Sequence, residues 1–197
     1  MNTRSAQITR KTNETDIDIR LALDGAGSST LMIPTGFLSH MLTAFTKNAR
    51  FDLNITATGD MNVDDHHTVE DIGIVLGQAI GTALADKKGI TRYGFFILPM
   101  DEALATVAID FSGRYAFRFD CAFTRERIGD LSSELVYDFW DAFAQNARAN
   151  VYIKVENGRN DHHKAEAIFK AMGRACRMAV AKDSESRGEI PSTKGSL

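Results

Sequence analysis

Apolar and polar residues alternate along several stretches of the chain in the pattern of half-buried β-strands. The first alternating run covers residues 17–23, and two more, at 107–111 and 115–121, follow in the second part of the chain. Successive side chains of a strand point to opposite faces, so these runs predict sheets with one buried face. Two further runs, at 51–55 and 151–155, each follow an amphipathic stretch of about a dozen residues that is typical of a helix.

A helical period of apolar residues follows each of the runs 51–55 and 151–155. After the first, the apolar positions are Val69, Ile72, Leu76, Ile80 and Ala83. After the second, they are Ala165, Ile168, Phe169, Met172, Cys176 and Ala179. Spacings of three and four residues place such side chains on one helical face, so each half is predicted to end with a strand and then a helix.

The same elements recur because the sequence itself repeats. Residues 47–51 (KNARF) resemble residues 145–149 (QNARA), 98 positions later, and a His-His pair recurs after 96 positions. We therefore predict an α+β fold with an internal duplication of two similar halves, each a small sheet with two helices on one face. The predicted halves are residues 1–92 and residues 93–197, the second with a C-terminal tail, joined in one compact domain.

Composition excludes several classes of protein. The net charge of −3 and the isoelectric point near 5.9 provide no general field for nucleic acid or an anionic membrane. No apolar run approaches the length of a membrane span, and the polar N-terminus is unlike a signal peptide. We expect a soluble, cytoplasmic protein without nucleic-acid or membrane partners, in which Cys121 and Cys176 are buried free thiols.

Four of the five histidines form two copies of one motif, His-His-x-x-Glu. The copies are His66, His67 and Glu70, and His162, His163 and Glu166; Asp65 and Asp161 precede them. On a helix, the first histidine and the glutamate share a face, while the second histidine points elsewhere. The motif therefore predicts two neighbouring metal ions. A helical ion pair on the surface is the alternative for either copy alone, and the duplication disfavours it.

The fifth histidine extends this prediction. His40 precedes the first pair by 26 residues, and its repeat-equivalent Asp138 precedes the second pair by 24. Both side chains can bind a metal, although Asp138 lies at the edge of an apolar stripe and could instead face solvent. Imidazoles and carboxylates without a thiolate suit Mn²⁺, Fe²⁺ or Zn²⁺, and the sequence does not choose among them.

Several short motifs resemble the imidazoleglycerol-phosphate dehydratase family of histidine biosynthesis. They are residues 13–15 (NET), 36–42 (GFLSHML), 64–71 (DDHHTVED), 99–102 (PMDE), 112–114 (SGR), 169–171 (FKA) and 191–195 (PSTKG). The resemblance runs from about Arg4 to Leu197 and keeps the order and spacing of the family.

The resemblance implies a hydro-lyase that converts D-erythro-imidazole glycerol phosphate to imidazole acetol phosphate. The proton to be lost is on a carbon without a neighbouring carbonyl, so metal ions on the imidazole ring would have to activate it. The implied cofactor is two Mn²⁺ per subunit, with other divalent transition metals possible. The resemblance implies these metal ligands: His40, His66, His67, Glu70, His162, His163 and Glu166. Together with Glu14, the implied proton shuttle, they make up the catalytic set. The duplication adds Asp138 to the predicted metal ligands, because it is the repeat-equivalent of His40.

The resemblance also implies a phosphate site and an assembly. The implied phosphate-binding residues are Arg92, Arg114, Lys170, Ser192 and Lys194, of which the last two make the polar tail an ordered lid. The implied assembly is a homo-oligomeric shell of 24 subunits built from trimers, with metal sites shared between neighbours.

The chain departs from the family at four positions, and two other function classes remain as alternatives. The family usually has an acidic or amide residue at Ser39, a histidine at Asn48 and Tyr152, and very often a histidine at Asp138. One alternative is a non-catalytic metal-binding paralogue with the same shell-forming fold. The other is a ferritin-like di-iron protein, which the strand-rich runs before each motif disfavour.

Overall fold

The computed structural model of the protein describes residues 4–186 and 188–197. The elements come in two similar series. The first consists of β1 (Ser5–Lys11), β2 (Thr15–Ala22), β3 (Ser29–Met32), α1 (Gly36–Ala49), β4 (Asp52–Gly59) and α2 (His66–Leu84). The second consists of β5 (Tyr93–Met100), β6 (Ala103–Asp110), β7 (Ala116–Asp120), the short β8 (Arg127–Ile128) and β9 (Leu131–Ser132), α3 (Leu135–Ala147), β10 (Asn150–Asn157) and α4 (Asp161–Val180). Apart from β8 and β9, both series have the same order, which confirms the predicted α+β fold and its duplication.

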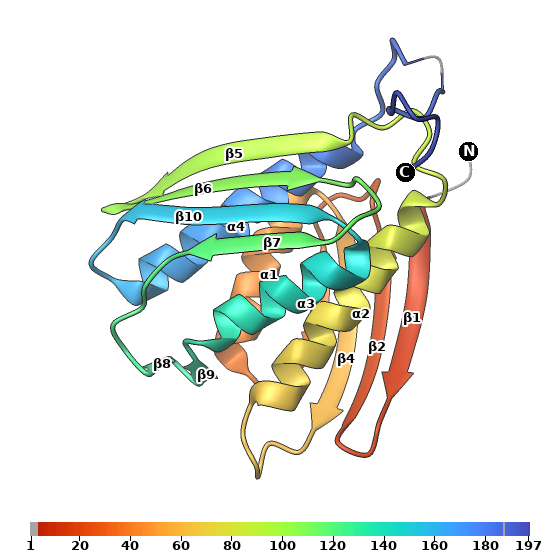
Figure 1. The fold of residues 1–197 in the computed structure, drawn as a ribbon. Helices are drawn as coiled ribbons and strands as arrows, with labels where there is room; N and C mark the ends of the chain where they lie inside the picture. Colours follow the sequence, from red (N-terminus) through yellow and green to blue (C-terminus); the bar gives the residue numbers. More distant parts are fainter. Residues whose placement is uncertain (1–3, 187) are drawn as a thin grey trace.

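The two large sheets have equivalent topologies (Figure 1). Their strand orders are β1-β2-β4-β3 and β5-β6-β10-β7, and in each the last pair is parallel while the others are antiparallel. The predicted alternation is seen in β2, where Ile17, Ile19 and Leu21 are buried. The predicted runs omitted β1, β3 and β5. These are edge strands, and β1 and β3 bury no residue fully, so their apolar alternation is weak.

The four helices lie between the two sheets and pair across the halves (Figure 1). α1 packs against α4, and α2 packs against α3, around a core that includes Phe45, Trp140 and Phe169. Each helix therefore packs between a sheet and a helix of the other half, so the helices bury both of these faces. Cys176 is buried and free as predicted, whereas Cys121 is free but only half-buried. No helix of the described residues is long and apolar enough to cross a membrane.

Glycines allow both helix pairs to approach through backbone atoms. A Cβ added at Gly173 of α4 would lie 2.5 Å from the carbonyl oxygen of Phe45 in α1. At the equivalent position, a Cβ on Gly77 of α2 would lie 2.5 Å from the carbonyl oxygen of Phe143 in α3. Separations this short do not occur for real Cβ atoms, so any larger residue would push the paired helices apart.

We predict that Gly173→Ala lowers the free energy of unfolding by about 1–3 kcal/mol, because the added methyl group overpacks the contact between α1 and α4. Gly81→Ala is the matched control, since the nearest atom to its Cβ would be 3.8 Å away. Its helix should gain up to about 1 kcal/mol from the better helix former. Urea unfolding of metal-free protein measures both changes. Equal effects of the two substitutions would contradict the role assigned to Gly173.

Candidate functional site

The segment 124–133, which contains β8 and β9, is joined to the starts of three helices. At the start of α1, Asp130 accepts hydrogen bonds from the backbone N–H groups of Gly36 and Phe37, at 2.6 and 2.8 Å. A carboxylate there satisfies unpaired N–H groups and the positive end of the helix dipole. All four helices begin at the end of the molecule where β8 and β9 lie, opposite the chain termini (Figure 1).

The aspartates that precede the two histidine motifs join α2 and α4 to the same segment. Asp161 accepts hydrogen bonds from the backbone N–H groups of Thr124 and Arg125, both at 2.8 Å. Burial alone would raise the pKa of Asp161, but hydrogen bonds from Lys164, Arg125 and Thr124 lower it to about 2. Asp65 accepts a hydrogen bond from the backbone N–H of Ser132 at 2.7 Å. The two copies of the motif are thus fixed to opposite ends of one loop.

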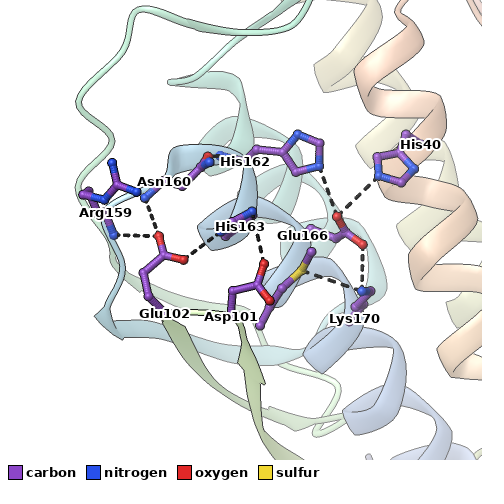
Figure 2. A network of polar contacts seen from close by, with 10 residues as sticks. His40, Asp101, Glu102, Arg159, Asn160, His162, His163, Glu166 and Lys170 are labelled. Carbon is purple, nitrogen blue, oxygen red and sulfur yellow. Dashed lines mark hydrogen bonds and ion pairs between the residues drawn. The ribbon is translucent and has the colours of Figure 1, made fainter.

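His40, His162 and Glu166 form a cluster between α1 and α4 (Figure 2). Glu166 Oε2 lies 3.1 Å from His162 Nε2 and 3.4 Å from His40 Nε2. Of all the residues described, only these three bring one nitrogen or oxygen ligand atom each to within 4.8 Å of the others. Glu166 is buried, which would raise its pKa, but Lys170, at 2.7 Å from Oε1, and the two histidines lower it. The cluster combines one helix from each half.

The repeat-equivalent residues His66, Glu70 and Asp138 form a looser group between α2 and α3. His66 Nε2 lies 3.9 Å from Glu70 Oε2, compared with 3.1 Å for the equivalent pair in α4. Burial raises the pKa of Asp138, the charge of His66 lowers it, and that of Glu70 raises it. Asp138 is therefore close enough to the other two residues for their charges to act on it, but it makes no close contact like those of the first cluster, and its side chain is shorter than the histidine at position 40.

The second histidine of each motif points away from these clusters, as helical geometry predicts, and meets a carboxylate. His67 Nδ1 lies 3.1 Å from Asp60 Oδ2, in the turn between β4 and α2. His163 Nδ1 lies 2.7 Å from Glu102 Oε2, and its Nε2 lies 3.4 Å from Asp101 Oδ2, at the tip of the β5–β6 hairpin (Figure 2). The hydrogen bond with His163 and then that with the N–H of Asn160 lower the pKa of Glu102 to about 2.

Glu14, the predicted proton shuttle, is exposed at the tip of the β1–β2 hairpin. Its carboxylate has no hydrogen bond or ion pair with the residues that the structure describes, but its charge reaches His67. The hydrogen bond with Asp60 raises the pKa of His67 against the effect of burial, and the charge of Glu14 raises it further. The predicted shuttle thus lies on the side of α2 where a predicted ligand points outward.

The predicted phosphate-binding residues do not come together as one group. Arg92 binds Asp110 through two hydrogen bonds of 2.6 and 3.0 Å and donates a third to the carbonyl of Pro191, next to Ser192. Lys170 instead lies beside Glu166 in the first cluster. The Arg114 and Lys194 side chains are exposed. Arg92 and Ser192 are therefore neighbours, while Lys170 lies in the middle of α4, nine residues before the Ala179 carbonyl that binds the backbone N–H of Arg92.

Sequence reasoning did not identify Asp60, Glu102, Asp101 and Asp130 as parts of this region. Glu102 and Asp101 belong to the PMDE motif that carries the family resemblance, which marked them without indicating a role. Asp60 lies five residues after the predicted strand run 51–55 and seven residues before His67, so this closeness in the sequence was the signal available. Asp130 is 94 residues from Gly36, and no local pattern connects them.

The fold and the site define an internally duplicated α+β protein whose paired helices carry histidine and carboxylate side chains in two equivalent groups. The family model for imidazoleglycerol-phosphate dehydratase matches residues 34–176. Relatives of that name from Acidiphilium cryptum and Ralstonia nicotianae are 52% and 50% identical over 194 residues, which cover 98% of this chain and 99% of each relative. The crystal structure of imidazoleglycerol-phosphate dehydratase from Staphylococcus aureus has a TM-score of 0.82 and 41% identity, and the match covers 90% of this chain and 99% of that one.

The chain therefore belongs to the imidazoleglycerol-phosphate dehydratase family, the hydro-lyases of histidine biosynthesis. The resemblance inferred from the short motifs is confirmed over the whole length of the chain.

We predict that Asp161→Asn lowers the free energy of unfolding near neutral pH by about 2 kcal/mol. The folded pKa of Asp161, about 2, lies below the ordinary value of 3.8, so its stabilisation is present above about pH 4 and is lost as the pH falls through 3.8 to about 2. Urea unfolding of metal-free protein across this range should show wild type and variant converging in acid. Asp86→Asn, which removes an exposed partner of Lys88, is the control and should change stability little. A stability difference for Asp161→Asn that is independent of pH would contradict the prediction.

Proposed function

We propose that this protein dehydrates D-erythro-imidazole glycerol phosphate to imidazole acetol phosphate in the cytoplasm, and that it uses two divalent ions per subunit, Mn²⁺ or another divalent transition metal. The observation that carries the proposal is the cluster of His40, His162 and Glu166 in a chain of this family. The geometry of the cluster needs both halves, which is expected of a site and unusual for a chance surface group.

The residues present fit a divalent ion. His40, His162 and Glu166 offer two imidazole nitrogens and a carboxylate oxygen within 4.8 Å of one another, and no thiolate is near. Lys170 and the loop contact of Asp161 hold Glu166 and the start of α4 in place. A bound divalent ion would supply the positive charge that polarises the imidazole ring of the substrate. The second group has Asp138 where the first cluster has His40. It therefore offers one carboxylate more and one imidazole fewer than the first cluster, which favours harder ions such as Mn²⁺.

Glu14 is the residue of this chain that we assign to proton transfer. Its exposed carboxylate can take the carbon-bound proton, whose electron pair forms the new carbon–carbon double bond as the carbon–oxygen bond breaks. The departing hydroxide takes a proton from the Glu14 carboxyl group and leaves as water, so the carboxylate is restored. The enol that results becomes the ketone by moving a proton from oxygen to carbon. Such a general base typically contributes about 10²–10⁴-fold to the rate.

One chain does not complete this site, which supports an assembly. Arg92 is bound through its backbone N–H to the carbonyl of Ala179, 17 residues after His162 in α4, a distance of roughly 25 Å along the helix. A small substrate cannot contact the first cluster and Arg92 of the same chain. We therefore propose that metal and phosphate groups of neighbouring subunits combine, in a shell of 24 subunits built from trimers. Arg114, Lys194 and Ser192 would join Arg92 at the phosphate.

We predict that purified protein binds about two Mn²⁺ per chain and forms imidazole acetol phosphate, and that chelation removes both metal and activity. Elemental analysis and a product assay measure these properties, and light scattering on the same samples should show a smaller metal-free species becoming a shell of 24 subunits on addition of Mn²⁺. Metal binding and assembly without product would identify a non-catalytic paralogue. Folded protein that retains well below one ion per chain after reconstitution would exclude the two-metal proposal.

We predict that Asp138→Ala reduces occupancy of one ion and lowers turnover by at least the roughly 10–100-fold typical of residues that support a ligand. Asp138→His should retain both ions and shift preference toward softer metals, since it restores the side chain found at the equivalent position 40. His40→Ala is the matched reference for the first cluster. If Asp138→Ala leaves metal content and turnover unchanged, Asp138 is an ordinary surface residue.

A further inference from the structure

The hairpins β1–β2 and β5–β6 hold the same place in the two sheets, and each ends with a glutamate directly before its second strand. Glu14 precedes the first residue of β2, and Glu102 precedes the first residue of β6. Glu102 contacts His163, and the charge of Glu14 reaches His67, so each hairpin glutamate is near the second histidine of a motif. The duplication has thus placed two equivalent carboxylates beside two equivalent imidazoles.

The surroundings of Glu102 fix its carboxylate completely. Oε1 accepts hydrogen bonds from the backbone N–H groups of Arg159 and Asn160, at 3.1 and 2.7 Å, in the turn before α4 (Figure 2). Oε2 is then directed at His163 Nδ1, 2.7 Å away. Because Arg159 and Asn160 precede His163 in the same turn, one carboxylate connects the hairpin, the start of α4 and the imidazole ring.

Glu14 has neither the backbone hydrogen bonds nor the close imidazole contact that Glu102 has. Its carboxylate is exposed and has no hydrogen bond within the described part of the chain. The task that Glu102 performs for His163 is performed for His67 by Asp60, which lies in the turn before α2 and contacts Nδ1 with both oxygens, at 3.1 and 3.3 Å. Asp60 therefore leaves Glu14 free.

We infer that Glu102 is a positioning residue that keeps Nε2 of His163 available as a ligand atom, and that the two hairpin glutamates have divided their tasks, with Glu102 holding an imidazole and Glu14 meeting the substrate. The inference rests on the proposed function, since it concerns how His163 and Glu14 serve that reaction. It assigns the same positioning task to Asp60 in the first half.

The chemistry of the neutral imidazole ring explains why this contact matters. One ring nitrogen carries a proton and the other a lone pair, and only the lone pair can bind a metal. A carboxylate accepts hydrogen bonds but donates none, so Glu102 at Nδ1 keeps the proton there and the lone pair on Nε2. Nε2 lies 3.4 Å from Oδ2 of the exposed Asp101, a longer and weaker contact than the 2.7 Å between Nδ1 and Glu102, so the contact at Nδ1 decides which nitrogen keeps the proton.

Glu102→Gln tests the positioning task without removing the structural contacts. The glutamine oxygen can still accept the N–H groups of Arg159 and Asn160, which turns the amide NH₂ toward His163 Nδ1. That group donates a hydrogen bond, so the ring should move its proton to Nε2 and lose its free ligand nitrogen. Glu14→Gln is the matched variant in the other hairpin. Glu156→Gln, an exposed glutamate of β10 bonded to Thr106, is the control for removing a negative charge nearby.

Two readouts separate positioning from catalysis. Nitrogen NMR of the histidine rings in metal-free protein, recorded over a range of alkaline pH, reports which nitrogen carries the proton. Titration with Mn²⁺, followed by electron paramagnetic resonance of the free ion, reports affinity. We expect Glu102→Gln to move the His163 proton to Nε2 and to weaken one Mn²⁺ by about 10–100-fold. Glu14→Gln should change neither, and should instead lower kcat by about 10²-fold or more at saturating Mn²⁺.

Other results would overturn the inference. If His163 keeps its proton on Nδ1 in Glu102→Gln and Mn²⁺ affinity is unchanged, Glu102 does not position the ring. If Glu14→Gln weakens Mn²⁺ as much as Glu102→Gln does, the tasks are not divided. If Glu156→Gln weakens Mn²⁺ binding as much as Glu102→Gln does, the loss of a negative charge alone explains the effect and Glu102 has no specific positioning role. A wild-type protein that binds no Mn²⁺ or forms no product would refute the proposed function, while the NMR measurement would still decide the role of Glu102.

Discussion

The backbone contact between α1 and α4 at Gly173 determines where the functional side chains meet. His40 lies five residues before Phe45 in α1, and Glu166 lies seven residues before Gly173 in α4, so both are roughly 7–11 Å from the contact toward the helix starts. The two helices therefore run in the same direction from a common end. Because the helices touch through backbone atoms, the His40 and Glu166 side chains reach each other, with Nε2 and Oε2 3.4 Å apart. A wider helix spacing would separate His40 from the Glu166 carboxylate, which would keep only His162 and Lys170 of its own helix as partners.

The same contact explains why the duplication produces a site that neither half contains. The first cluster takes α1 from the first half and α4 from the second, while the equivalent group takes α2 and α3 in the reverse combination. Each half buries the inner side of its helices against the other, so hydrophobic packing and the assembly of the clusters are the same event. The helix starts are then fixed to one loop by Asp65, Asp130 and Asp161, which places both groups at one end of the molecule.

The local periodicities predicted the elements that have one clearly buried face, together with the histidine helices and the duplication. They did not predict the edge strands β1, β3 and β5, although the edge strand β7 lies within the predicted run 115–121. In β1 and β3 one face is exposed and the other only partly buried, so the apolar alternation is weak. The periodicities also could not predict the helix pairing, because Gly173 and Phe45 are 128 residues apart and a glycine within a helical pattern reads only as a weak helix former. Within the site, helical geometry correctly separated the first from the second histidine of each motif. It did not identify Asp60 and Glu102, which approach the second histidines from other elements.

Carboxylates are abundant in this region, but permanent partners leave few of them able to carry a proton. Asp161, held by four donor groups of Thr124, Arg125 and Lys164, and Glu102, held by His163 and two N–H groups, both have a pKa of about 2 and stay deprotonated near neutral pH. Such groups can position a loop or an imidazole, but they cannot take up and release a proton in a catalytic cycle. Within the described part of the chain Glu14 accepts no hydrogen bond, and Asp60 already occupies the Nδ1 side of His67. In the proposed reaction, the first half thus has a hairpin glutamate that is free to meet the substrate, whereas the second half uses its hairpin glutamate to hold His163.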